Sequence, residues 1–161
     1  MMMFSEQFLE QGSYEIEYNG RKVNAFFTFD RKGEYILKFK FISTSSELGQ
    51  AIIIHWDRFV GQMFINGTGV KKPKGRFPQT VIAQKYAPEQ FEIKVVLESG
   101  KFRICNGSDL LGDEKIWRSL YGGCAMIIEE LGENHFRMHC NDHDNDDDFD
   151  DMIFELHISK I

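Results

Sequence analysis

The strongest concentration of groups that could bind a cation is an acidic run at residues 142–151, which contains seven aspartates. Counted from Asp144, carboxylates occupy positions 1, 3, 5 and 7 of a twelve-residue loop, and Glu155 occupies position 12, as in an EF-hand calcium loop. Phe149 stands at position 6, where such a loop needs glycine, and no helix pattern flanks it. Three interpretations stay open: a calcium site, weak attraction of cations, and a disordered acidic loop.

We expect the acidic run to be mobile and solvent-exposed, and to hold no stoichiometric metal site. Seven like charges in ten residues repel one another unless a cation neutralises them. A calcium loop would also force Phe149 to a positive φ angle, which is costly for a residue other than glycine. Burial between two sheets is unfavourable for so much charge. Proteases should therefore cut this run early, with little loss of the rest of the domain.

Sites for enzymatic chemistry are scarce in the sequence. A glycosidase needs two carboxylates that flank its substrate, and the strand predicted at residues 51–59 supplies Asp57 alone. His135, His139 and Cys140 share a short run, but strand alternation places His139 and Cys140 on opposite faces, which argues against a zinc site. No nucleophile elbow or phosphate-binding loop occurs. We therefore expect a protein that is not an enzyme and needs no cofactor.

The elements that would position such groups are predicted to be β-strands. From Tyr35 to Phe41 every second side chain is aromatic or aliphatic, which indicates one face in a core and the other in water. Many short runs of this kind, separated by turn signals such as Asn19-Gly20, are typical of an all-β antiparallel β-sandwich. Its core is expected to include six side chains: Phe39, Phe41, Ile93, Val95, Phe102 and Ile104.

The most informative stretch is residues 91–107, which is predicted to form a β-hairpin. Apolar side chains alternate on both sides of Ser99-Gly100, and this pair is predicted to be the turn. Residues 62–65 are predicted to be a short strand that ends at the turn Asn66-Gly67, and residues 152–158 a further strand. The only predicted helix spans residues 112–121.

The chain has 161 residues, enough for one domain with a core of its own, and we expect a single domain over residues 1–161. No apolar run reaches about 18 residues, so no membrane span is expected. The first residues lack the basic and apolar regions of a signal peptide, and the three cysteines, without CxxC spacing, suggest reduced thiols. We therefore expect a cytoplasmic protein, or an extracellular one exported independently of a signal peptide.

The net charge of −6 is concentrated in the acidic run, because removal of its seven negative charges leaves the rest of the chain at +1. Nucleic-acid binding requires a basic face, and the short basic segment at residues 71–76 is too isolated to provide one. We therefore expect no nucleic-acid partner. A homodimer stays open, since no pattern identifies a contact at a sheet edge.

The order of several segments resembles that of a galectin carbohydrate-recognition domain. The similar segments are residues 9–20 (LEQGSYEIEYNG), 35–41 (YILKFKF), 52–59 (IIIHWDRF), 62–66 (QMFIN), 91–107 (FEIKVVLESGKFRICNG) and 126–138 (MIIEELGENHFRM). The resemblance is strongest over residues 9–140, with residues 141–151 as an acidic loop or insertion and 152–161 as a terminal strand. It implies a jelly-roll sandwich of the galectin and concanavalin type that binds a β-galactoside or another glycan.

The resemblance also implies a sugar site, for which the best candidates are Arg58, Asn66 and Phe77, followed by His55 and Trp56. In galectins a histidine and an arginine four residues apart bind hydroxyls, a downstream asparagine adds a contact, and a tryptophan stacks on the sugar. Here His55 and Arg58 are three residues apart, so strand alternation separates them unless a bulge near Asp57 restores the alignment.

Two further positions depart from the family pattern. Phe77 lies nearest to the place of the stacking tryptophan, which is absent, and residues 79–82 stand where galectins have a Glu/Arg pair. The expected function is therefore a lectin with weak or altered β-galactoside binding. The alternative is a galectin-fold domain that has lost its sugar site and binds a protein partner.

Overall fold

The computed structural model describes residues 3–70, 79–109, 112, 123–142 and 148–161. Within these ranges the chain forms one helix and eleven strands, and no helix is long and apolar enough to cross a membrane. In chain order the elements are α1 (Phe4–Gln11), β1 (Glu15–Tyr18), β2 (Arg21–Asn24), β3 (Phe27–Phe29), β4 (Gly33–Thr44), β5 (Gln50–Ile65), β6 (Thr68–Val70), β7 (Gln79–Ala83), β8 (Gln90–Ser108), β9 (Ala125–Gly132), β10 (His135–Asn141) and β11 (Met152–Lys160).

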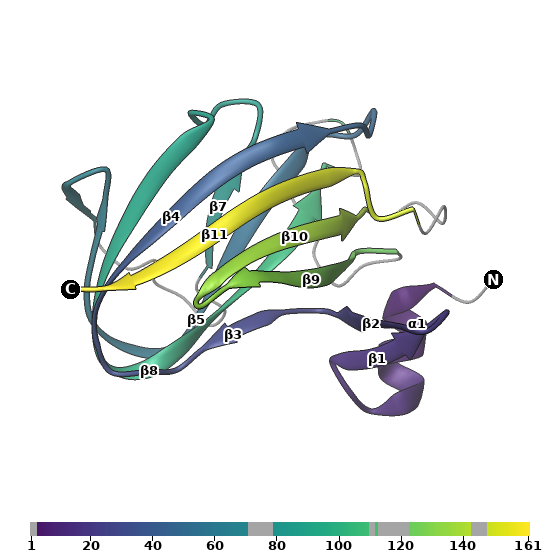
Figure 1. Ribbon diagram of the computed structural model, residues 1–161, viewed down its shortest axis with the longest axis horizontal. Helices are drawn as coiled ribbons and strands as arrows, with labels where there is room; N and C mark the ends of the chain where they lie inside the picture. Colours follow the sequence, from purple (N-terminus) through teal and green to yellow (C-terminus); the bar gives the residue numbers. More distant parts are fainter. Residues whose placement is uncertain (1–2, 71–78, 110–111, 113–122, 143–147) are drawn as a thin grey trace.

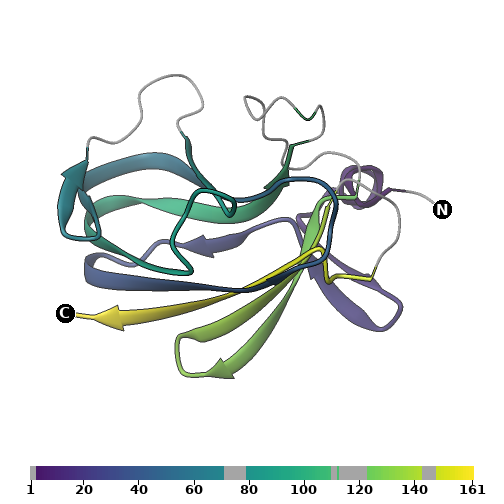
Figure 2. The same cartoon turned by 90° about the horizontal axis from the view of Figure 1, so that it is seen from above.

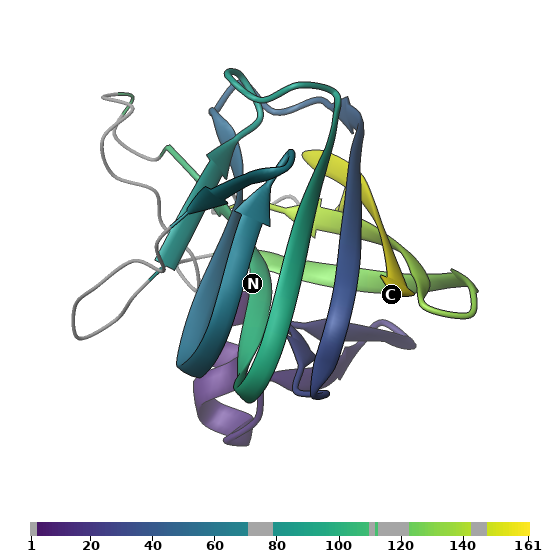
Figure 3. The same ribbon diagram turned by 90° about the vertical axis from the view of Figure 1, so that its left-hand side faces the viewer.

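The fold is an all-β antiparallel sandwich made from one continuous sheet, as the alternation predicted. The strand order is β1-β2-β9-β10-β11-β4-β8-β5-β6, with β3 paired to β8 and β7 paired to β5. The first half of β8 pairs with β4 and its second half with β3, while β5 pairs with β8 along its other edge (Figure 1). Figures 2 and 3 show how the sheet curves, with β9 and β10 running across the direction of β4, β5 and β8.

The core lies between the two layers and is rich in phenylalanine. All six side chains predicted for the core are buried, which confirms that prediction. The rings of Phe39 and Phe91 stack with centroids 4.9 Å apart, and those of Phe29 and Phe102 lie 5.3 Å apart. Lys38 and Lys40 on β4 point the other way and are exposed, because strand side chains alternate between faces. The sequence pattern was therefore sufficient to identify the core face.

The predicted hairpin at residues 91–107 is wrong, because β8 runs through this stretch as one strand. The buried positions change from odd numbers before Ser99 to even numbers after Gly100, which a turn or a one-residue irregularity explains equally well. The structure has the irregularity: Gly100 adopts a φ of +89°, and the register of the neighbouring β5 shifts between Asp57 and Gly61.

β5 is likewise one strand of sixteen residues, where the sequence predicted two strands. Gly61 has a φ of +148° at the bulge, and a Cβ atom there would lie 1.8 Å from the carbonyl oxygen of Val96. A Cβ on Gly100 would lie 2.1 Å from the carbonyl oxygen of Arg58. The two glycines therefore let β5 and β8 approach and bend together, which no side chain would permit.

The helix α1 was not predicted, although its sequence carries the signals of one. Phe4 and Phe8 are four residues apart and bury one face, and the Glu6 carboxylate accepts a hydrogen bond from the Met3 N–H at 3.1 Å. Gly12 ends the helix with a φ of +62°. Figure 1 shows α1 beside β1 and β2 at one end of the molecule. The helix predicted at residues 112–121 lies outside the described residues, apart from its first position.

The exposure predicted for the acidic run is wrong for several of the residues that are described. Asp142, Phe149 and Asp151 are all buried. The Phe149 ring packs 5.3 Å from that of Phe4, and the Asp142 N–H donates to Asp151 Oδ2 at 2.8 Å. Phe149 does adopt a positive φ, +57°, because burial of its ring under α1 offsets the local strain. Residues 143–147 of the run lie outside the described part of the chain.

Candidate functional site

Trp56, one of the predicted sugar contacts, belongs to the core. Its indole is 4% exposed and packs against Phe59 and Phe102, with ring centroids 4.9 and 5.5 Å away. Its Nε1–H donates to Thr80 Oγ1 at 2.9 Å on the neighbouring β7. A buried indole usually needs such a partner, and this one is supplied within the fold. In this arrangement Trp56 presents no ring face to a ligand in solvent.

Asn66 lies in the turn after β5, far from the other candidates. Its φ is +49°, and its Oδ1 accepts a hydrogen bond from the Glu92 N–H at 2.9 Å. Because β5 is continuous, roughly 36 Å of chain separates His55 from Asn66 at about 3.3 Å per residue. The structure therefore does not bring these two together. Phe77 lies outside the described residues.

His55 and Arg58 could share one face of β5 only if a bulge lay near Asp57, and Arg58 lies at such a bulge. Its φ is +53°, and the register of β5 against β8 shifts directly after Asp57. Arg58 and Asp57 line a hollow of about 530 Å³ together with Asp30 and Lys101. Lys101 Nζ lies 3.7 Å from Asp57 Oδ2 across the two strands. The bulge thus brings an exposed arginine to the hollow that adjoins the outward face of β5.

His55 lies two residues before Asp57 on that outward face, opposite Arg103 of β8. Its ring meets the ring of Phe26 edge-on, with centroids 5.7 Å apart. The guanidinium of Arg103 lies over the same Phe26 ring, 4.4 Å from its centroid. Burial, helped by the positive charge of Arg103, lowers the pKa of His55, which keeps the imidazole neutral near pH 7.

Tyr14 completes this surface, with its ring 5.2 Å from that of Phe26 and with 57% of the residue exposed. We define the His55 patch as seven residues: Tyr14, Phe26, His55, Asp57, Arg58, Lys101 and Arg103. Sequence reasoning found His55 and Arg58 but missed Tyr14, Phe26 and Arg103. Alternation does point Arg103 away from the core. Its place beside His55 follows only from the register of β5 against β8, which no local pattern encodes.

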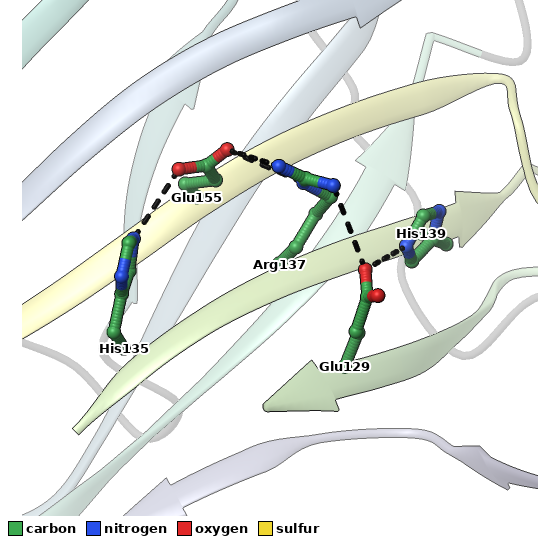
Figure 4. Close-up of polar contacts among 5 residues, drawn as sticks. All are labelled: Glu129, His135, Arg137, His139 and Glu155. Carbon is green, nitrogen blue, oxygen red and sulfur yellow. Dashed lines mark hydrogen bonds and ion pairs between the residues drawn. The ribbon is translucent and has the colours of Figure 1, made fainter. Parts of the chain in front are cut away.

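A second polar surface lies on the outward face of β9, β10 and β11 (Figure 4). We define the β10 ladder as five residues: Glu129, His135, Arg137, His139 and Glu155. From His135 to His139 every second residue of β10 is an arginine or a histidine, and the two glutamates come from the flanking strands. Arg137 lies between both glutamates, 3.0 Å from Glu155 and 3.7 Å from Glu129. His135 and His139 lie 3.2 and 3.1 Å from Glu155 and Glu129, respectively.

Each of the five residues of the β10 ladder has an ion-pair or hydrogen-bond partner within the ladder. Burial alone would raise the pKa of Glu155, but the hydrogen bonds from Arg137 and His135 outweigh it and lower that pKa below its usual range. Cys140, next along the chain from His139, points into the core, as alternation predicted. Burial raises the pKa of the Cys140 thiol well above its usual range. His139 and Cys140 therefore cannot bind one metal ion together.

The described end of the acidic run brings three carboxylates together. Asp148, Asp150 and Asp151 have oxygen atoms within 4.8 Å of one another, and the first two are exposed. Asp150 also accepts a hydrogen bond from the Ser45 hydroxyl at its backbone oxygen, 2.8 Å away. Exposed acidic groups are common without a bound ion, so this grouping by itself assigns no metal site.

Comparisons with models of known protein families, with curated proteins and with solved structures found no match to this chain.

Proposed function

We propose that this protein is a carbohydrate-binding protein and that the His55 patch is its binding surface. The observation that carries the proposal is an aromatic pair, Tyr14 and Phe26, set beside a hollow lined by Asp57, Arg58 and Lys101. His55 connects the two parts, because its ring meets that of Phe26 and it precedes Asp57 by two residues on β5.

The chemistry of a sugar suits such a surface. Apolar C–H faces of a sugar ring pack on aromatic rings, and the exposed Tyr14 ring offers such a face. Sugar hydroxyls accept hydrogen bonds from guanidinium and ammonium groups and donate them to carboxylates, and charge-assisted bonds of this kind are stronger than neutral ones. A neutral His55 can add either a donor or an acceptor.

The galectin resemblance makes a β-galactoside the first sugar to test. His55 and Arg58 are the positions that carry this part of the resemblance, and the bulge allows both to serve one ligand. Trp56 and Asn66 have structural partners instead, so the affinity for a galactoside is proposed to be weak or altered. Binding without catalysis is proposed because the galectin resemblance implies a protein that only binds its sugar.

The test is a glycan array followed by titration of lactose and of the best array ligands by calorimetry. His55→Ala and Arg58→Ala should each weaken binding about tenfold, the loss of one or two charge-assisted hydrogen bonds. The matched control is Arg137→Ala in the β10 ladder, which removes the same charge from another surface and should leave binding unchanged. Absence of any sugar binding at millimolar concentration would overturn the proposal.

The alternative is a domain that binds a protein partner and no sugar. It is favoured by the core position of Trp56 and by the Asn66 amide oxygen, which accepts a hydrogen bond from the Glu92 N–H. In that case Arg58→Ala and Asn66→Ala should leave capture of the partner intact in a pull-down. Loss of the partner in these two variants alone would count against it.

A further inference from the structure

Arg103, in the His55 patch, carries a positive charge that has no counter-charge among the described residues. Within that part of the chain none of its five N–H groups donates a hydrogen bond, and no carboxylate forms an ion pair with it. Arg137 of the β10 ladder is the contrast, since its guanidinium donates twice to Glu155 and lies 3.7 Å from Glu129. The donors of Arg103 are therefore unused by the described fold.

The guanidinium of Arg103 is held in place and partly removed from water. The residue is only partly exposed, and the group lies over the Phe26 ring, 4.4 Å from its centroid. Of its three nitrogens only Nε is fully buried, so Nη1 and Nη2 stay accessible to solvent. The ring offsets part of the cost of lost hydration. An anion that accepts from Nη1 and Nη2 would offset more, through charge-assisted hydrogen bonds.

The strands beside Arg103 place no carboxylate opposite it. Its partner in β5 is His55, and its partner in β3 is Thr28. Lys101, two residues earlier on the same face of β8 and about 7 Å away along the strand, adds a second positive charge. The nearby Asp57 lies 3.7 Å from the Lys101 ammonium. This end of the His55 patch is therefore positive, although the chain carries a net charge of −6.

The hollow at the other end of the patch has a different charge balance. Two carboxylates, Asp30 and Asp57, line it together with two basic side chains, Arg58 and Lys101. Carboxylates accept hydrogen bonds from sugar hydroxyls but repel a second anion. A ligand with one charged end would therefore place that end at Arg103 and its hydroxyls at the hollow.

We propose that the His55 patch prefers an acidic sugar, a galactoside that carries a carboxylate or a sulfate group. The oxyanion accepts hydrogen bonds from Arg103, and the sugar hydroxyls lie at the hollow beside Arg58. Both kinds of acidic group present paired oxygen atoms, which a guanidinium binds through two parallel hydrogen bonds. This inference rests on the proposed function, because it names the class of sugar for the same surface.

The test is calorimetric titration of the whole chain, at physiological ionic strength, with two pairs of sugars. The methyl glycosides of galacturonic acid and of galactose differ only in a carboxylate in place of a hydroxymethyl group. Lactose sulfated on its galactose and lactose itself differ only in the sulfate, so the two pairs separate the two sources of the oxyanion. At least one acidic sugar should bind about tenfold or more tightly than its neutral partner, as expected for hydrogen bonds between charged groups.

Arg103→Met keeps an apolar stem over Phe26 and removes the guanidinium. It should weaken the preferred acidic sugar about tenfold and leave the neutral partner within about twofold of its affinity for the unmodified protein. A melting temperature close to that of the unmodified protein shows that this variant folds. Arg137→Met is the matched control, since it removes the same group from the β10 ladder and should leave the preference for the acidic sugar unchanged.

Three results would overturn this inference and leave the proposed function intact. The first is equal binding of the acidic and the neutral sugar in both pairs. The second is a preference for the acidic sugar that persists in Arg103→Met. The third is a loss of preference in Arg137→Met as large as that in Arg103→Met, which would mean a diffuse attraction between charges. If none of the four sugars bound at millimolar concentration, the proposed function itself would fail, and this inference with it.

Discussion

The His55 patch and the β10 ladder are polar surfaces on the outward side of one sheet, but they are built on different principles. In the β10 ladder, Arg137 joins two glutamates and each of these glutamates also contacts a histidine (Figure 4). In the His55 patch a guanidinium lies over an aromatic ring, and a hollow opens beside a bulge.

The difference between the two surfaces follows from strand geometry. Between Phe136 and Cys140 the pairing of β10 with β9 and with β11 is regular, which places opposite charges side by side so that they satisfy one another. A bulge breaks this regularity and re-aims a side chain, as it does for Arg58. The proposed role of the His55 patch therefore depends on the bend in β5 and β8.

The largest expected effect comes from removing the bend. Gly61→Ala should lower the free energy of unfolding by at least about 3 kcal/mol, because its Cβ would lie 1.8 Å from the Val96 carbonyl oxygen. Gly132→Ala, at the end of β9 near the β10 ladder, should change stability by less than about 1 kcal/mol, since no atom lies within 4 Å of its Cβ. Urea denaturation of both variants measures this. Equal losses would mean that the bend is not under steric control.

The next effect concerns the guanidinium over Phe26. Arg103→Lys keeps the charge but loses the planar group, and it should weaken binding of the best sugar ligand about tenfold. Arg137→Lys makes the same change in the β10 ladder and should leave sugar binding as it is. Calorimetric titration compares the two. If Arg103→Lys and Arg137→Lys bound the sugar equally well, the sugar would bind outside the His55 patch.

A smaller effect concerns the pH dependence of stability. The pKa of His55 is lowered in the folded protein, so the unfolded chain binds a proton more readily below a pH of about 6.5. This contribution to stability is complete above that pH and is lost as the pH falls towards the folded-state pKa. His55→Gln should therefore flatten the fall in melting temperature between about pH 7 and pH 5. His157→Gln, at an exposed position on β11, should show the same fall in melting temperature as the unmodified protein. An unchanged pH profile in His55→Gln would mean that His55 does not cause this fall.

The smallest effect is expected in the β10 ladder. Glu155→Gln removes the charge that Arg137 and His135 contact, and should cost about 1 kcal/mol or less, because the pairs are partly exposed. The lowered pKa of Glu155 means that this contribution is present above its unfolded-state pKa and disappears as the pH falls through the folded-state value. Denaturation at a series of pH values should show the variant's deficit in full at pH 7 and a decreasing deficit as the pH is lowered. A loss of more than about 2 kcal/mol in the free energy of unfolding would mean that the β10 ladder stabilises the protein more than ordinary surface ion pairs do.

The candidate site was partly predictable from the sequence. His55 and Arg58 are recognisable by type and spacing, but the sequence left open whether a bulge near Asp57 aligns them, and the structure supplied that bulge. Phe26 and Tyr14 gave no such signal, because their neighbours come from strands distant in the chain. For the acidic run the prediction of exposure was wrong. It was based on charge, whereas Phe149 and Asp151 are buried against other parts of the fold.

By itself the sequence determined the fold class, the core face of β4 and β8, and the strand β11, because alternation of apolar side chains is a local property of a strand with one buried face. Only the tertiary structure decided that residues 90–108 are one bent strand, which Gly61 and Gly100 make possible through close backbone approach. It also decided which outward side chains meet, because the pairing of His55 with Arg103 depends on long-range register. Local patterns fix which way a side chain points, whereas the register between distant strands fixes its neighbours.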